Sequence, residues 1–285
     1  MRTILPTVPL VAALAAAPAV ALADDETEYH FGFTTGTSVG DIGEKEIQSR
    51  LTGRFGKDAG HYSMLSNKLE AEYVPLRDFR LSLAAYVTQH RIAGIPGLDD
   101  RRSGAFDGLA FGLKYRLIDR EHGPFGLAVE AEPQWRRMDG TSGAPVDQIG
   151  GQYSLLLDKE LVSNRIISAF NLVYEPEVSR SRLDGTWSHE STVRVAAAIM
   201  AQAQPHVSYG LETRYLRKYE GLALDRFAGH ALYVGPTVSA TLPRGYWLLA
   251  AWSIQVAGRS VGGQGPLDLT NFERHQVRLK LGFNY

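Results

Sequence analysis

The chain has 285 residues with a net charge of −1, and it contains no cysteine. The near-neutral charge argues against a nucleic-acid-binding protein, because phosphate binding needs an excess of lysine and arginine on one face. Without cysteine, disulfides, thiol catalysis and thiolate metal ligands are excluded.

The first 23 residues have the pattern of an export signal. Arg2 precedes an apolar run interrupted by Pro9 and Pro18, and Ala21-Leu22-Ala23 is a small-x-small cleavage sequence. We therefore expect a signal peptide over 1–23, cleaved near Ala23, and a single mature domain over 24–285. Residues 24–44 form a lead-in of undetermined form, within which 31–40 (FGFTTGTSVG) is an additional strand, an arm tucked inward or a periplasmic segment.

Beyond the lead-in, alternating apolar and polar residues recur about every 20 positions, with short and long connections in turn. This predicts an all-β fold, a closed antiparallel transmembrane barrel of about 12 strands with a range of 10–14. An even number brings both chain ends to the periplasmic rim. The expected strands are 45–55, 62–74, 79–90, 106–118, 125–137, 148–159, 165–177, 190–201, 206–218, 230–241, 246–257 and 273–285.

Each clear strand has one apolar and one polar face. A soluble barrel or sandwich would bury the apolar face, whereas a membrane barrel turns it toward lipid. The length of the strands, the aromatic final strand and aromatic residues at strand ends favour the membrane barrel. Those at the short-turn end are Phe79, Phe125, Tyr246, Trp247 and Tyr285, and those toward the long loops are Trp135, Tyr174 and Tyr215. The expected membrane-facing residues are Leu109, Phe111, Leu113, Leu127, Val129, Leu248, Trp252, Leu279, Leu281, Phe283 and Tyr285.

Segments such as LEAEYVPLRDFRLSLAAYV, FDGLAFGLKYRLID, PFGLAVEAEP, NLVYEPE and the closing HQVRLKLGFNY carry a family likeness. With them the chain, from about Gly32 to Tyr285, resembles a family of proteobacterial outer-membrane β-barrels of unknown function. That family is loosely similar to transporter-like barrels encoded near aromatic-degradation pathways. The resemblance implies a barrel in the outer membrane, inserted by the barrel-assembly machinery through the C-terminal strand, with lipid and lipopolysaccharide as neighbours. It carries no catalytic or binding residue.

The polar face predicts a charged lumen. Walls of both signs lower the cost of moving polar solutes or ions, so a narrow passive pore for an unknown small solute is the leading hypothesis. The alternatives are a structural or adhesive barrel whose charges pair across strands, a lipid hydrolase and a soluble periplasmic β-domain. The candidate pathway residues are Lys68, Glu70, Glu72, Arg80, Lys114, Arg116, Glu130, Glu132, Arg136, Arg194, Glu212, Arg214, Arg278 and Lys280.

Catalytic and metal motifs are weak. Ser188 and His189 are adjacent on a strand and point to opposite faces, so they cannot share a proton, and Ser191 is two positions from His189. Glu130 and Glu132 share a face as in glycosidases, but Lys114 and Arg116 on the neighbouring strand predict ion pairs instead. The histidines show no ligand spacing. We expect no enzyme activity, no cofactor and no metal.

Overall fold

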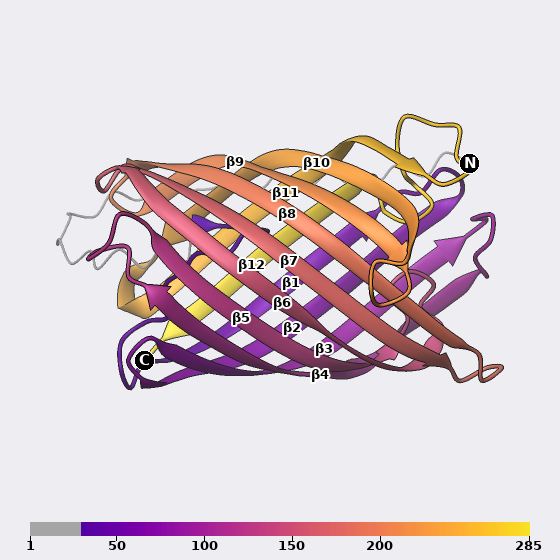
Figure 1. The fold of residues 1–285 in the computed structure, drawn as a ribbon, viewed down its shortest axis with the longest axis horizontal. Helices are drawn as coiled ribbons and strands as arrows, with labels where there is room; N and C mark the ends of the chain where they lie inside the picture. Colours follow the sequence, from indigo (N-terminus) through magenta and orange to yellow (C-terminus); the bar gives the residue numbers. More distant parts are fainter. Residues whose placement is uncertain (1–29) are drawn as a thin grey trace, which may run out of the picture.

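The computed structural model describes residues 30–285, so the expected signal peptide over 1–23 lies outside the described residues. Twelve antiparallel strands form one closed barrel in which each strand pairs with its neighbours in sequence (Figure 1). The predicted fold class and strand number are confirmed. The strands are β1 Lys45–Phe55, β2 His61–Leu76, β3 Phe79–Ala93, β4 Arg101–Ile118, β5 Gly126–Met138, β6 Pro145–Val162, β7 Ile166–Ser181, β8 Trp187–Gln204, β9 Val207–Glu220, β10 Arg226–Thr241, β11 Tyr246–Ser260 and β12 His275–Asn284.

The first and last strands close the barrel. β1 pairs antiparallel with β12, and Leu51 lies opposite Leu279 at the middle of this register. The backbone amide of Tyr285 donates to the carbonyl of Lys45 at 2.9 Å, which extends the pairing to the end of the chain. Closure leaves neither β1 nor β12 with an unpaired edge, as a sheet surrounded by lipid requires.

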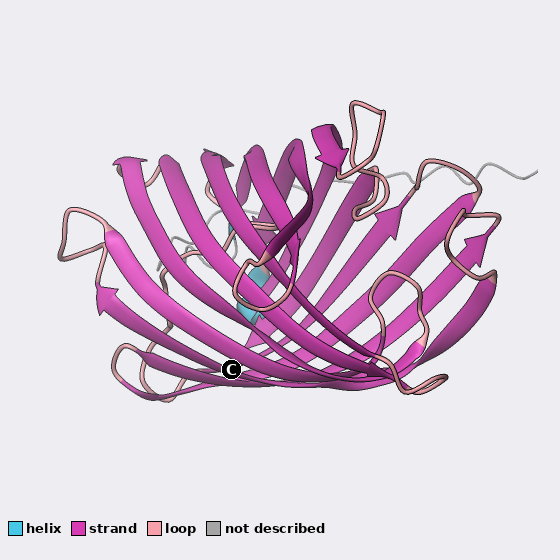
Figure 2. Cartoon of the chain, turned by 45° about the vertical axis from the view of Figure 1, so that its right-hand side comes forward, coloured by secondary structure: helices cyan, strands magenta, loops and turns pink. Residues whose placement is uncertain are grey.

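The connections divide between two rims (Figure 2). The short-turn rim, at residues 77–78, 119–125, 163–165, 205–206 and 242–245, also carries the start of β1 and the end of β12. The long-loop rim consists of 56–60, 94–100, 139–144, 182–186, 221–225 and 261–274.

Several strands extend further toward the long-loop rim than the alternation predicted. β6 begins at Pro145 rather than 148, and β7 continues to Ser181 rather than 177. Their backbones still pair there, with Asp147 opposite Arg180. The alternation weakens in this region because both faces of the sheet are polar, so the sequence understated the strand length.

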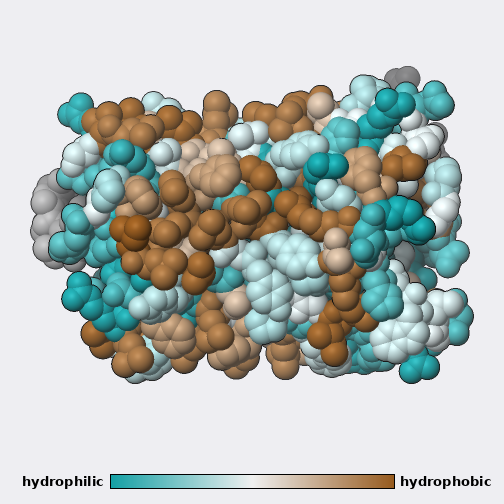
Figure 3. Space-filling view, viewed as in Figure 1, coloured by the Kyte–Doolittle hydropathy of each residue, from teal (hydrophilic) through white to brown (hydrophobic). Residues whose placement is uncertain are grey.

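Side-chain burial reverses the pattern of a soluble protein. On β4, Phe111 is 45% exposed on the outer face, whereas Lys114 is 2% exposed on the inner one. On the face shown in Figure 3, apolar side chains predominate over the middle of the barrel and hydrophilic ones gather at its two ends. The barrel therefore presents an apolar outer face and encloses its charges.

Helix is nearly absent from the described residues. The 3-10 turn η2 spans Pro243–Gly245 in the β10–β11 connection. Within 30–285 there is no helix with the length and apolar character needed to cross a membrane.

Candidate functional site: a charged lumen closed by the N-terminal segment

Residues 30–40, here called the inner segment, lie inside the barrel close to the short-turn rim. They form no strand, so of the three forms left open for 31–40 the structure shows the arm tucked inward. Phe31 is 0% exposed and packs against Ile167 and Met200 on β7 and β8. Phe33 packs against Leu249 on β11. The inner segment therefore touches the barrel wall in two separate places, at β7–β8 and at β11.

A single carboxylate holds the start of the inner segment. Glu212 on β9 accepts hydrogen bonds from the backbone amides of Gly32 at 2.6 Å, Phe33 at 2.9 Å and Thr34 at 2.7 Å. The hydroxyls of Thr34 and Thr237 donate to the same carboxylate at 2.8 and 2.5 Å. A buried carboxylate needs such donors, and these five supply them without a cation.

The other end of the inner segment is held from β6 and β7. Thr37 donates its amide to Asp158 at 2.7 Å and its hydroxyl to the same side chain at 2.9 Å. The amide of Thr35 donates to Asn171 at 2.7 Å, and Asn171 returns a hydrogen bond to the Thr35 carbonyl at 2.8 Å. Side chains on β6, β7 and β9 thus replace the strand partners that this backbone lacks.

Basic side chains on β9 and β12 also bind the inner segment. Lys280 donates to the carbonyl of Phe31 at 2.9 Å, and Arg278 donates to that of Gly32 at 3.2 Å. The guanidinium groups of Arg214 and Arg278 lie 3.7 and 4.6 Å from the ring centre of Phe33. Such cation–π contacts are strongest where water is excluded, as it is around this buried ring.

The long-loop rim is narrowed by the second half of the loop at 261–274, where Asp268, Leu269, Phe272 and Glu273 are buried. Lys57 donates to the carbonyls of Thr270 at 3.1 Å and Phe272 at 2.9 Å, and it lies 3.8 Å from Glu273. Burial lowers the pKa of Lys57, and the charge of Glu273 opposes that shift. Gln255 on β11 exchanges hydrogen bonds with the backbone of residue 268.

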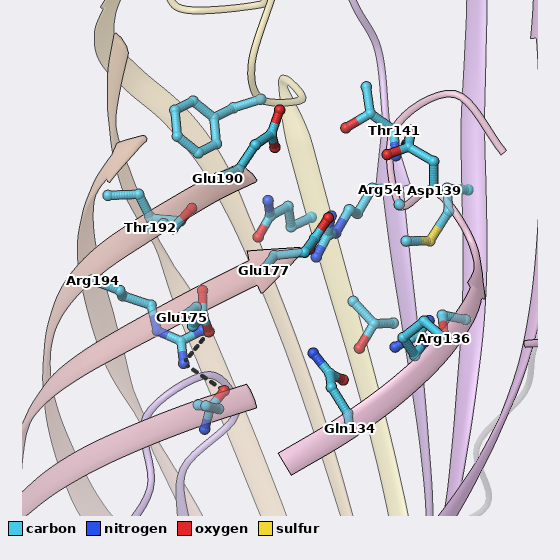
Figure 4. A pocket seen from close by; sticks show the side chains of 18 of the residues that line it. Arg54, Gln134, Arg136, Asp139, Thr141, Glu175, Glu177, Glu190, Thr192 and Arg194 are labelled. Atoms are coloured by element: carbon cyan, nitrogen blue, oxygen red, sulfur yellow. Dashed lines mark hydrogen bonds and ion pairs between the residues drawn. The ribbon is translucent and has the colours of Figure 1, made fainter. Parts of the chain in front are cut away.

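Between this loop and the inner segment lies a cavity of about 320 Å³. It is lined by Phe272 and Glu273 at the loop end and by Arg214 and Arg278 at the inner-segment end. Figure 4 shows side chains converging on it from several strands, with Arg194 hydrogen-bonded across the wall. Charged side chains of both signs therefore line this cavity.

Much of the wall charge is paired. Lys68 lies 2.8 Å from Glu70 and 2.5 Å from Glu132, and Arg80 lies 2.9 Å from Glu72. Glu132 reaches Lys68 on β2 across the interior, a partner that the alternation of neighbouring strands did not predict.

Arg116, the other expected partner, turns away from the lumen. Its guanidinium group lies 2.7 Å from Asp78 and 3.5 Å from Asp119, both at the short-turn rim. Lys114 and Glu130 remain register neighbours on β4 and β5.

The candidate pathway residues fall into three groups by position. Six of them line the cavity: Lys68, Glu132, Arg136, Arg194, Arg214 and Arg278. Glu212 and Lys280 hold the inner segment. The remaining six, Glu70, Glu72, Arg80, Lys114, Arg116 and Glu130, belong to the wall or to the short-turn rim.

The residues expected to face lipid occupy the outer side of the sheet. Leu109, Val129, Leu248, Trp252, Leu279, Leu281 and Tyr285 are exposed like Phe111, and Leu113, Leu127 and Phe283 are partly exposed. Trp247 is an exception among the aromatic residues assigned to the short-turn belt. It is 2% exposed and packs on Phe33 inside the barrel, because position 247 faces inward when Tyr246 and Leu248 face outward.

Sequence reasoning missed Asp107. This residue is 1% exposed, and its carboxylate accepts hydrogen bonds from Arg136, Thr88 and the amide of Met138. A β-bulge beside Gly108 places positions 107 and 108 both inward, whereas strict alternation from Leu109 would put Asp107 on the outer face. An acidic residue directly before a glycine within a strand was the available signal.

The weak catalytic and metal candidates are not assembled into a site. His189 is exposed, and the hydroxyl of Ser191 donates to the carbonyl of Gly221 at 2.7 Å rather than to His189. Among residues 30–285, Asp119, Glu121 and His122 form the one group whose ligand atoms lie within 4.8 Å of one another. The Asp119 carboxylate is already paired with Arg116, so the arrangement of this group is explained by the β4–β5 turn without a metal ion.

A closed antiparallel barrel with an apolar outer face and a polar interior is the fold of bacterial outer-membrane proteins. The chain belongs to DUF6662, a family of unknown function whose model matches residues 23–285. This confirms the resemblance to an outer-membrane barrel family of unknown function. No curated protein sequence matches the chain.

Solved structures share the fold at low sequence identity. An outer-membrane channel from Pseudomonas putida F1 is 12% identical, with a TM-score of 0.56, covering 92% of this chain and 100% of that one. The translocator domain of the autotransporter NalP from Neisseria meningitidis is 11% identical, with a TM-score of 0.53, covering 87% and 91%. The β-domain of the Bordetella autotransporter BrkA is 14% identical, with a TM-score of 0.51, covering 86% and 100%.

Proposed function

We propose that the protein is an outer-membrane channel for small polar solutes or ions, in which the inner segment sets a closed state. The observation that carries this proposal is the charged cavity of about 320 Å³ enclosed by the barrel. Polar walls lower the free energy of a hydrated solute in a lumen that lipid cannot enter. The fold shared with the Pseudomonas putida channel supports the proposal.

A barrel without conductance is the second candidate. The four hydrogen bonds from the inner segment to Glu212, together with those to Asp158 and Asn171, favour it, because a tightly held inner segment obstructs passage. The two candidates differ in whether the lumen conducts once that segment is removed.

The experiment compares the full chain with a deletion of residues 30–40 in planar bilayers. Heat-modifiable gel mobility first establishes that both proteins are folded barrels. A channel gives small or intermittent currents with the full chain and larger, steady currents with the deletion. A folded deletion variant that passes no current would favour the non-conducting barrel.

The orientation we propose places the short-turn rim in the periplasm and the long loops, with their lipopolysaccharide contacts, outside. The lack of native cysteine makes this simple to test with single-cysteine variants. In intact cells an impermeant maleimide should label Leu183→Cys in the β7–β8 loop and not Arg244→Cys in the β10–β11 turn. The reverse labelling would contradict the orientation, and no surface labelling of either site together with soluble fractionation would contradict the location.

A further inference from the structure

The cavity contains more positive than negative charge. Its lining has eight basic and six acidic side chains. Lys68 pairs with Glu132, Arg194 with Glu175 at 3.2 Å, and Lys218 with Glu190 at 2.7 Å. These pairs neutralise part of the lining and leave an excess of arginine.

Three arginines in the lining, Arg54, Arg214 and Arg278, form no ion pair with a described carboxylate. Arg214 donates to the hydroxyl of Ser253 at 2.7 Å, and Arg278 donates to that of Thr52 at 3.2 Å. Within residues 30–285, neither of them nor Arg54 has a carboxylate within ion-pair distance. The Glu212 carboxylate accepts its hydrogen bonds from the inner segment and Thr237 rather than from these arginines, so its charge offsets theirs only through space.

Donors without acceptors lie in the same place. The Nε atoms of Arg50 and Arg194 are buried and donate to no described group. Buried N–H donors are rarely left without a partner in folded proteins, because the lost hydrogen bond costs about 1–3 kcal/mol. Uncompensated charge in a site of low dielectric constant costs more. An anion in the cavity would relieve both costs.

We propose that Arg54, Arg194, Arg214 and Arg278, the arginine tier, form a binding site for the oxyanion group of a small solute, a carboxylate or a phosphate. Guanidinium groups suit this role because their planar N–H groups match the oxygens of both anions and stay charged. The tier lies next to the inner segment, through the contacts of Arg214 and Arg278 with Phe33. An anion that enters from the long-loop rim therefore meets it just before the obstruction.

This inference rests on the proposed channel for its purpose, but binding is measured without transport. Full-length protein in detergent is heated with increasing inorganic phosphate or with succinate, and the midpoint of unfolding is followed by gel mobility. Sodium chloride at equal ionic strength is the control for screening. A saturating rise in the midpoint with phosphate, succinate or both, absent with sodium chloride, is the expected result.

The variant Arg54→Gln removes one member of the tier without touching the inner segment, and it should weaken the apparent affinity about tenfold. The matched control is Arg217→Gln, which changes an exposed arginine on the outer face of β9 and should bind like the parent. Arg278→Gln is a second variant, with folding checked by heat-modifiable mobility.

The outcomes are distinct. A response to phosphate alone assigns phosphorylated solutes, and a response to succinate alone assigns carboxylates. Equal effects of sodium chloride, or unchanged affinity in folded Arg54→Gln, would overturn the site. Anion binding without conductance in the deletion variant would support the anion site and reject the channel. Conductance without anion binding would support the channel and reject the anion site.

Discussion

Glu212 holds Thr34 twice, accepting one hydrogen bond from its backbone amide at 2.7 Å and another from its hydroxyl at 2.8 Å. The two residues are separated by 178 positions in sequence. The contact joins the start of the described chain to the ninth strand of the barrel and keeps a segment that pairs with no strand in a defined place.

The first prediction concerns this contact. Replacing Glu212 by alanine removes the acceptor for three backbone amides, each worth about 1.5–3 kcal/mol when the acceptor is charged. In a Val39→Cys background the added substitution should raise the maleimide labelling rate at least about tenfold, since Val39 is 0% exposed in the parent. Glu121→Ala, at an exposed turn on the same rim, is the control, and an unchanged rate would show that Glu212 does not retain the segment.

A second prediction tests the buried pair beneath the bulge of β4. Asp107→Ala leaves Arg136 without its carboxylate partner and should lower the free energy of unfolding by about 3–5 kcal/mol. Urea unfolding in lipid vesicles measures the change. The exposed Asp58→Ala should be nearly neutral, and equal losses in both variants would argue against a special role for the pair.

The third prediction places the apolar face against lipid. Leu113→Arg introduces a charge on the outer face of β4 and should cost about 2–4 kcal/mol if that position is near the bilayer midplane. The same substitution at Leu183, which is 67% exposed in the β7–β8 loop, should change stability little. Equal stability of the two folded variants in vesicles would indicate that Leu113 does not face hydrocarbon.

The fourth prediction is a pH dependence at the long-loop rim. The pKa of Lys57 is lowered by burial from 10.5, so the unfolded chain binds more protons than the folded one between the lowered value and 10.5. The contribution of this group is fully favourable above 10.5 and is lost as the pH falls through the folded value. Stability should therefore rise more steeply with pH in the parent than in Lys57→Gln, measured by urea unfolding across that window. Identical slopes would contradict the assignment.

The sequence predicted the barrel because the strands alternate visibly, as Leu109, Phe111 and Leu113 do on β4. It did not predict the place of Asp107, because one bulge at Gly108 reverses the faces of the residues before it. An added Cβ at Gly108 would lie 1.9 Å from the carbonyl oxygen of Trp135, so the bulge requires glycine at this position. A glycine within a strand is not by itself sufficient to predict a bulge.

The inner segment was equally hard to predict. It has no periodicity, because its partners are side chains such as Glu212 and Asp158 rather than a neighbouring strand. Its fit also depends on distant residues, since a Cβ at Gly32 would lie 2.4 Å from that of Ala251. These groups come together only when the barrel closes. The sequence alone therefore could not distinguish among a strand, an inward arm and a periplasmic segment for residues 31–40.

The short link between the inner segment and β1 has a kinetic consequence. Residues 41–44 turn directly into Lys45, and Gly43 is fixed there by its hydrogen bond to the carbonyl of Val74 at 2.8 Å. If the inner segment leaves its binding position, so short a link keeps it close to the barrel. Its effective concentration at that position stays at about the millimolar range, as short linkers give. Rebinding of the inner segment would be a unimolecular step whose rate does not depend on protein concentration. The state without the bound segment would therefore be short-lived unless another group occupies the same position.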